Sequence, residues 1–226
     1  MPSRLRPTAP IAADAVLVGD PGRALLLAQE LLAEPKMSNH ARGLWGYFGH
    51  TPGGRELTVQ STGIGAPSAV AVLADLAELG VHRAVRVGTC QALPDGPGAG
   101  ELLAVTFARA HDGVSLALGV ERGGAVQPDA VLLTALRREL PEGGRSAPVA
   151  SFDLPAAEAG AEGETETEVA ADLQTAALLT RAPALGVAAA ALLIVAEDAD
   201  GRRLSDEDLE EAAKQAGRLA AAILST

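Results

Sequence analysis

The sequence predicts an α/β protein, and three observations support this fold class. Short apolar runs alternate with longer stretches rich in Ala and Leu, which is typical of strands alternating with helices. Several of the short runs end in glycine-rich turns. The chain has 226 residues, enough to bury a full core, so we expect one domain spanning residues 1–226. We find no internal repeat and no linker between two cores.

The predicted elements follow in order along the chain. Strands are expected at residues 13–18, 56–60, 83–87, 102–106, 115–118 and 189–195. Helices are expected at residues 24–32, 68–79, 129–140, 169–181 and 206–224. Ser205 followed by three acidic residues is typical of a helix start, which supports the last helix. Residues 155–168 are acidic and lack large apolar groups, so we expect a surface loop there.

Composition excludes several classes of protein. The formal net charge of −11 argues against nucleic acid or an anionic membrane as the main partner. Cys90 is the only cysteine, which excludes an intrachain disulfide. The first ten residues lack the apolar core of a signal peptide, and apolar runs such as residues 187–196 are too short to span a bilayer. We therefore expect a cytoplasmic protein without a membrane segment.

The stretch VLVGDPGRA, residues 16–24, joins a predicted strand to a predicted helix. Gly19 and Gly22 let the backbone approach a ligand closely, and the amides of a helix start favour an anion. Arg23 adds a planar fork of donors suited to phosphate. The spacing matches neither the P-loop nor the GxGxxG motif. The stretch indicates an anion site or, alternatively, a turn with a solvated arginine.

Two further glycine-rich stretches, STGIGAPS at residues 61–68 and RVGTC at residues 86–90, also end predicted strands. Open α/β sheets place ligands at the carboxyl ends of their strands, so the three stretches could converge on one pocket. Arg23, Arg86 and Thr89 would then hold an oxyanion through charge-assisted bonds.

Four motifs, GDPGRA, NHARGLWGYFG, STGIGAPS and RVGTCQAL, resemble in this order the nucleoside phosphorylase family, which includes uridine phosphorylase and the hexameric purine nucleoside phosphorylases. The resemblance is specific over residues 12–92 and returns at residues 170–200, where DLQTAALLT occupies the place of the family's EMEA segment. It implies a three-layer α/β/α sandwich with a mixed, partly barrel-like central sheet. It also implies phosphorolysis of a uridine-type or purine-type nucleoside to a free base and (deoxy)ribose 1-phosphate. Phosphate is a substrate in this reaction, and no metal or organic cofactor is expected.

The resemblance also implies roles for individual residues. Gly19, Arg23, Arg86 and Thr89 would bind phosphate, and Arg42 would reach the phosphate of a neighbouring subunit. The chain is therefore expected to form a homo-oligomer, a hexamer built as a trimer of dimers. The residues implied at the nucleoside are Cys90, Gln91, Phe152, Asp172, Leu173 and Gln174.

The acid that would assist the leaving base is Glu197 or Asp198 in VAEDADG. Either could protonate a purine if burial favours its neutral form; the alternative is a solvated acidic turn. For Cys90 we expect packing and no catalytic role. The spacing of the four histidines predicts no metal site.

Three positions depart from the family. Gln174 stands where the family has a glutamate that binds ribose hydroxyls, and an amide keeps an acceptor but loses the charge. Pro155 falls near the place of the aromatic that stacks on the base, so stacking would come from Phe152 or be absent. Gln91 replaces a glycine and could read a base edge or fill the pocket. The preferred base and the choice between ribose and deoxyribose therefore stay open.

Two alternatives to a phosphorylase remain at this point. The first is a catalytically weakened paralogue that binds phosphate and nucleoside, which the changes at Gln174 and Pro155 suggest. The second is a hydrolytic nucleosidase, which dispenses with phosphate and should not need Arg23, Arg42 and Arg86 together.

Overall fold

The computed structural model describes residues 4–160 and 167–225. In this part of the chain the strands are β1 (Asp14–Val18), β2 (Ala33–Asn39), β3 (Gly46–His50), β4 (Glu56–Ser61), β5 (Arg83–Ala92), β6 (Leu102–Ala110), β7 (Gly124–Val126), β8 (Arg145–Ser151), β9 (Ala170–Asp172) and β10 (Ala188–Glu197). The helices are α1 (Pro21–Leu31), η1 (Ala41–Gly43), α2 (Gly65–Glu78), α3 (Gly113–Ala117), α4 (Ala130–Glu139), α5 (Ala156–Ala159), α6 (Thr175–Ala184) and α7 (Asp206–Leu224).

The described strands form one mixed sheet that closes on itself at one end. β1 runs parallel to β4 on one side and to β5 on the other. Beyond β4 the sheet continues through β3 to β2, both antiparallel to their neighbours. β5 pairs with both β10 and β9, and the order β10, β6, β8, β9 leads back to β5. This closed ring confirms the predicted mixed, partly barrel-like sheet.

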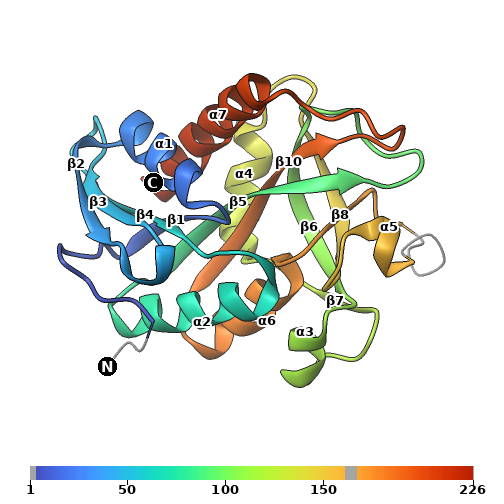
Figure 1. Cartoon of the computed structure of the whole chain (residues 1–226), viewed down its shortest axis with the longest axis horizontal. Coiled ribbons are helices and arrows are strands. Elements are labelled where there is room, and N and C mark those ends of the chain that lie inside the picture. The colour runs from blue at the N-terminus through green and yellow to red at the C-terminus, as the bar shows by residue number, and fades with distance from the viewer. Residues whose placement is uncertain (1–3, 161–166, 226) are drawn as a thin grey trace.

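Helices cover both faces of the sheet, with α1, α4 and α7 on one side and α2 and α6 on the other (Figure 1). Because both faces are covered, β10 is buried along most of its length, and its sequence AAAALLIVAE is almost entirely apolar. α7 packs closely on α1 at Gly217, where a Cβ atom would stand 2.7 Å from Leu27 Cδ2. The predicted three-layer α/β/α arrangement is confirmed.

The strand expected at residues 115–118 is wrong. Helix α3 (Gly113–Ala117) occupies this place, because Asp112 accepts hydrogen bonds from the backbone N and the Oγ of Ser115, at 2.8 and 2.6 Å. An aspartate at this position satisfies a free N–H of the first helical turn. The apolar residues that follow therefore form a helical turn.

The helix expected at residues 169–181 is correct only in its second part. The segment begins as strand β9 (Ala170–Asp172), and helix α6 begins at Thr175. The Asp172 carboxylate accepts hydrogen bonds from the backbone N and the Oγ1 of Thr175, which caps the helix there. The other expected elements lie within a few residues of observed ones.

Strand β2 (Ala33–Asn39) forms an end of the sheet, and among the described strands it pairs only with β3. It contains Pro35, a positive φ of 47° at Glu34 and two shifts of register against β3. This strand and β3, β7, β8 and β9 were not predicted, because polar residues, Gly and Pro interrupt the apolar pattern or the strand is short.

Part of the loop expected at residues 155–168 is helical, since α5 spans Ala156–Ala159; residues 161–166 lie outside the described residues. Among the helices of the described segments, none combines the length and apolar composition needed to cross a bilayer.

Candidate functional site

A cavity of about 710 Å³ lies at the carboxyl ends of β1, β4 and β5. The predicted site residues that line it are Gly19, Arg23, Arg86, Thr89, Cys90, Gln91, Asp172, Leu173, Gln174 and Glu197. The three glycine-rich stretches therefore do converge, as expected from parallel strands that end at one edge of a sheet.

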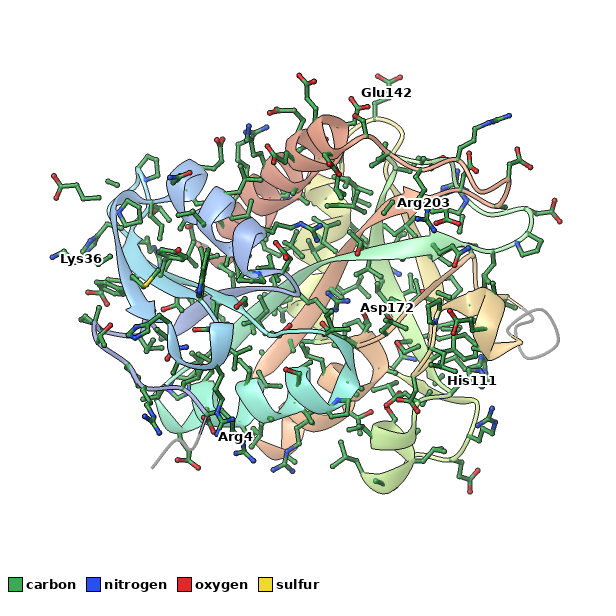
Figure 2. All side chains as sticks on the ribbon, in the orientation of Figure 1. Arg4, Lys36, His111, Glu142, Asp172 and Arg203 are labelled. Atoms are coloured by element: carbon green, nitrogen blue, oxygen red, sulfur yellow. The ribbon has the colours of Figure 1, made fainter. Side chains whose placement is uncertain are left out.

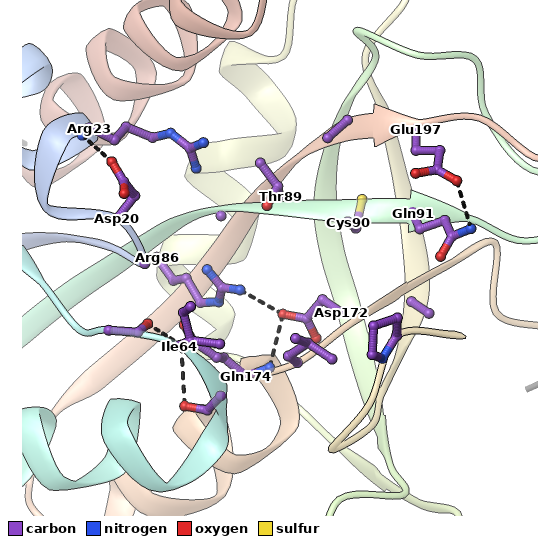
Figure 3. A pocket seen from close by; sticks show the side chains of 18 of the residues that line it. Asp20, Arg23, Ile64, Arg86, Thr89, Cys90, Gln91, Asp172, Gln174 and Glu197 are labelled. Atoms are coloured by element: carbon purple, nitrogen blue, oxygen red, sulfur yellow. Dashed lines mark hydrogen bonds and ion pairs between the residues drawn. The ribbon is translucent and has the colours of Figure 1, made fainter. Parts of the chain in front are cut away.

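The first of these stretches turns from β1 into α1. The side chain of Asp20 accepts a hydrogen bond from the backbone N of Arg23 at 2.8 Å and caps the helix, and Pro21 is the first helical residue. The Arg23 side chain points into the cavity (Figure 3). Burial lowers the pKa of this guanidinium below its ordinary value; Asp20 opposes the shift and the positive charge of Arg86 adds to it. Within the described residues no carboxylate forms an ion pair with Arg23.

Arg86 enters the same cavity from β5 and is nearly fully buried, with 5% of its surface exposed. Its Nη2 donates to Asp172 Oδ2 at 2.8 Å. The side chain lies over Gly88, where a Cβ atom would stand 1.9 Å from Nη1. The buried Nε of Arg86 has no acceptor in the described part of the chain, and a buried donor without a partner is costly. Two guanidinium groups thus face one space, and of the described carboxylates that line it only Asp172 forms an ion pair with either of them.

Asp172 lies inside the molecule, whereas Lys36 and Glu142 point away from its surface (Figure 2). Besides Arg86, its carboxylate accepts from Ser151 Oγ at 2.5 Å and from Thr175 Oγ1 at 2.7 Å. Its acceptor positions are therefore occupied by protein groups. In this structure the carboxylate holds Arg86, and it does not point as a free acceptor toward a ligand.

Gln174 follows at the start of α6 and contacts the glycine-rich turn before α2. Its Nε2 donates to the carbonyl oxygens of Gly63 and Gly65, at 2.6 and 3.2 Å. Its Oε1 accepts from Thr62 Oγ1 at 3.3 Å. Both ends of the amide are thus engaged with the turn, and Ile64 between the two glycines is 85% exposed at the rim of the cavity.

At the other end of the cavity, Gln91 and Glu197 lie side by side at the ends of β5 and β10 (Figure 3). Gln91 Nε2 donates to Glu197 Oε1 at 3.2 Å, and Arg203 Nε donates to Glu197 Oε2 at 2.6 Å. The surrounding walls are apolar and include Ala171 and Leu173. This end of the cavity thus offers a carboxylate beside an apolar surface.

Two more residues of the RVGTC stretch complete the wall. Thr89 is partly exposed to the cavity. Cys90 is buried and its Sγ donates to the carbonyl oxygen of Ile194 at 3.6 Å. Burial raises the pKa of the thiol far above its ordinary range; Asp172 adds to this shift and Arg86 opposes it. The thiol therefore stays protonated, in agreement with the expectation that Cys90 packs and does not react.

Three predicted site residues lie outside this cavity. Arg42 is exposed on η1, with a left-handed φ of 60°. Asp198 accepts hydrogen bonds from the backbone N of Asp200 and of Arg202, which shapes the turn after β10. Phe152 is buried and stacks on His111, with ring centroids 4.9 Å apart, so this aromatic is not a lining group of the cavity.

A family model described as the phosphorylase superfamily matches residues 14–226. The chain belongs to this superfamily. Curated relatives named "Purine nucleoside phosphorylase DeoD-type" include one from Oceanobacillus iheyensis, 43% identical over 84 residues, or 37% of this chain and 35% of the relative. Another from Caldanaerobacter subterraneus is 41% identical over 87 residues, or 38% of this chain and 37% of the relative. The matched segment thus spans about a third of these superfamily members.

Superfamily membership confirms the resemblance drawn from the four motifs. Sequence reasoning nevertheless missed three groups that shape the site: Gly88, Ser151 and Arg203. Only Gly88 had a local signal, because a glycine two residues after an arginine on one strand leaves room for the arginine to fold over it. Ser151 and Arg203 reach the site through strand pairing that no local pattern records. Across the described residues, no cluster of His, Cys, Asp and Glu has the geometry of a metal site.

Proposed function

We propose that the chain catalyses phosphate-dependent cleavage of a purine nucleoside to the free base and (deoxy)ribose 1-phosphate. The observation that carries this proposal is the pair of arginines, Arg23 and Arg86, which enter one cavity from different elements. Their charges disfavour each other; Asp172 pairs with Arg86, while the charge of Asp20 acts on Arg23 without forming an ion pair with it. A phosphate dianion between the two guanidinium groups would balance the site through charge-assisted bonds.

Phosphate would lie between Arg23, Arg86 and Thr89, close to the backbone at Gly19, with an oxygen directed toward the anomeric carbon of the sugar. That oxygen forms the new bond to the anomeric carbon while the bond from this carbon to the base nitrogen breaks and its electron pair leaves with the base. The protein contributes by orienting the anion and by stabilising the charges that develop. No metal or organic cofactor takes part in the proposed reaction.

The departing base would face the apolar end of the cavity, where Glu197, after taking a proton from solvent, would donate it to a purine ring nitrogen. Of the two acids considered, Glu197 lines the cavity and Asp198 is engaged in the turn. Gln91 and Arg203 hold the Glu197 carboxylate from both sides. The names of the relatives support a purine as the base over uracil.

Arg42 supports an assembly in which subunits share their sites. It is exposed on η1 and does not line the cavity of its own chain, so it could contact phosphate only in another copy. We propose a homo-oligomer in which Arg42 completes the neighbour's phosphate site, with a trimer of dimers as the expected form. A cytoplasmic location stays a prediction.

The test is a panel of purine and pyrimidine nucleosides, incubated with and without inorganic phosphate, with the released base and sugar phosphate separated by chromatography. We expect base release that requires phosphate and yields equal amounts of the pentose 1-phosphate. Arg86→Ala should abolish this release, and Arg55→Ala, which removes an exposed arginine on the turn between β3 and β4, should leave it unchanged. Release without phosphate would instead indicate a hydrolytic nucleosidase.

A weakened binding paralogue is the second candidate, because two observations favour it. Gln174 is engaged with the turn before α2, and none of the described lining residues is aromatic. This candidate predicts that phosphate and nucleoside raise the melting temperature while the panel shows no base release. Turnover of any nucleoside would exclude it.

A further inference from the structure

Gln174 is 3% exposed, and its side chain lies between the start of α6 and the turn formed by residues 62–65. Its amide nitrogen donates to two carbonyl oxygens of that turn, at 2.6 Å for Gly63 and 3.2 Å for Gly65. Its amide oxygen accepts from Thr62 Oγ1 at 3.3 Å. Each polar atom of the side chain therefore serves the turn.

The turn depends on such a partner. Gly63 and Gly65 have positive φ angles of 76° and 78°, so the chain turns sharply just before α2, and the Gly63 carbonyl precedes the helix and lies outside its regular hydrogen-bond pattern. Ile64, which precedes α2, provides no side-chain cap, and it is exposed at the rim. Thr62 N donates to Val18 O at 2.7 Å, which ties the start of the turn to the end of β1 beside Gly19.

We propose that Gln174 is a positioning residue, which fixes the turn of residues 62–65 as a wall of the cavity by donating from a neutral amide to Gly63 and Gly65. The inference rests on the proposed function for its effect on turnover, while its effect on the turn is independent of any reaction. It departs from the role that the resemblance implies, in which this position accepts hydrogen bonds from sugar hydroxyls.

A carboxylate at this position distinguishes the two roles. In Gln174→Glu, an oxygen would take the place of Nε2 and face the carbonyl oxygens of Gly63 and Gly65, and an ionised carboxylate has no proton to donate. A protonated carboxyl restores one donor. We call the hydrogen bonds from residue 174 to the Gly63 and Gly65 carbonyl oxygens the clamp. The variant should therefore lose the clamp at neutral pH and recover part of it on acidification.

Burial and the charge of Asp172 support this direction. Residue 174 is 3% exposed, and removal from water disfavours a carboxylate. Asp172 on β9 accepts from the backbone N of Gln174 at 3.3 Å, and its charge disfavours a second carboxylate. Arg86 and Arg23 favour the ionised form, but Arg86 is already paired with Asp172 and Arg23 lies across the cavity. A new carboxyl group here would thus hold its proton to a higher pH than an exposed one.

The experiment compares hydrogen–deuterium exchange of a peptide covering residues 61–68 with the kinetics of base release. The variants are Gln174→Glu and Gln174→Met, which has similar volume but no amide, and Gln215→Glu on the exposed face of α7 is the matched control. At pH 7.5 we expect both Gln174 variants to exchange about tenfold faster than the wild type, which is what loss of roughly 1.4 kcal/mol of local stability gives. The control should match the wild type.

Lowering the pH to 5.5, with exchange corrected for its intrinsic rate, should return Gln174→Glu toward wild-type protection and leave Gln174→Met unprotected. The value of kcat/KM for a purine nucleoside, taken relative to the wild type at each pH, should follow the same pattern. If Gln174→Glu is as well protected as the wild type at pH 7.5, or more active than it, the side chain faces the sugar and the proposal is overturned.

The two proposals can fail separately. If the wild type releases no base from any nucleoside, the proposed function fails, and the exchange comparison still decides the role of Gln174. If Gln174→Glu does not fold, Gln174→Met decides it: unchanged exchange at residues 61–68 in that variant overturns the clamp.

Discussion

Substitution of Gly88 by alanine tests how the Arg86 guanidinium is held in the cavity. A Cβ atom at residue 88 would lie 1.9 Å from Arg86 Nη1 and 2.4 Å from Cζ, far inside van der Waals contact. The guanidinium is the far end of a flexible side chain, so it moves more readily than the backbone of β5. Gly88→Ala should therefore yield a folded protein in which Arg86 is displaced.

The expected effect on phosphate follows from the contact that is lost. A hydrogen bond to a charged group contributes about 1.5–3 kcal/mol, and each 1.4 kcal/mol is a factor of ten. The KM for phosphate should therefore rise by about 10- to 100-fold. The free energy of unfolding should fall by about 3 kcal/mol, the lower end for a broken buried pair, because Ser151 and Thr175 still donate to Asp172.

The assay is initial-rate kinetics at saturating nucleoside with phosphate varied, and urea unfolding measures the stability. Gly53→Ala is the matched control, because its new Cβ atom would have only Thr51 Oγ1 nearby, at 3.8 Å. An unchanged KM for phosphate in a Gly88→Ala protein would refute the view that the position of Arg86 over this glycine determines phosphate binding.

Three further predictions concern other parts of the molecule. Glu197→Gln should lower kcat for ordinary purine nucleosides by about 10²- to 10⁴-fold, and much less for a nucleoside whose base leaves without protonation; equal losses for both would exclude an acid role. Light scattering should show at least a dimer. Arg42→Ala should raise the KM for phosphate without changing the mass of the assembly, whereas an active monomer would contradict a shared site. Burial raises the pKa of Cys90, so above the ordinary thiol value of 9.0 the folded state holds a proton that the unfolded state releases. The wild type should then lose up to about 1.4 kcal/mol of stability per pH unit relative to Cys90→Ala in urea titrations, and parallel curves would show that the thiol does not contribute.

Much of the sheet could be predicted because its inner strands carry their own signal. β1, β5 and β10 are apolar runs ending at glycines or polar residues, and burial on both faces makes such runs continuous. The strand end with Arg23 could likewise be predicted to line a cavity, since it joins a strand end to a helix start, and it does so. That it binds an anion stays a prediction.

The rest of the site depends on contacts between distant parts of the chain. Asp172 was expected at the nucleoside, but it is held by Arg86, 86 positions earlier, and by Ser151 on β8. Gln174 turns toward Gly63 for the same reason, since strand pairing brings the start of α6 against the turn before α2. At both positions the residue type predicted a group that accepts or donates hydrogen bonds. Which residue it bonds to is determined by the fold.

The wrong prediction of a strand at residues 115–118 has a different cause. The sequence VSLAL has the apolar character of a short strand, and an Asp three residues before Ser115 is a capping signal of equal weight. The cap prevails, and the apolar residues of the segment complete a helical turn. Phe152 was predicted to stack on a base, but its aromatic ring packs on His111 instead, a contact that the local sequence does not indicate.

Closure of the five-strand ring has a consequence for how the protein avoids self-association through its sheet. A barrel has no unpaired strand edges, so among the described strands the exposed backbone is confined to β2 and the three-residue β7. Three features of β2 disfavour pairing with a strand of another chain. Pro35 offers no N–H, Lys36 places a charge on the edge, and two irregularities twist the strand away from a flat ribbon. The fold thereby limits template-like addition of foreign strands to two edges, of which β7 is short and β2 is poorly shaped for it.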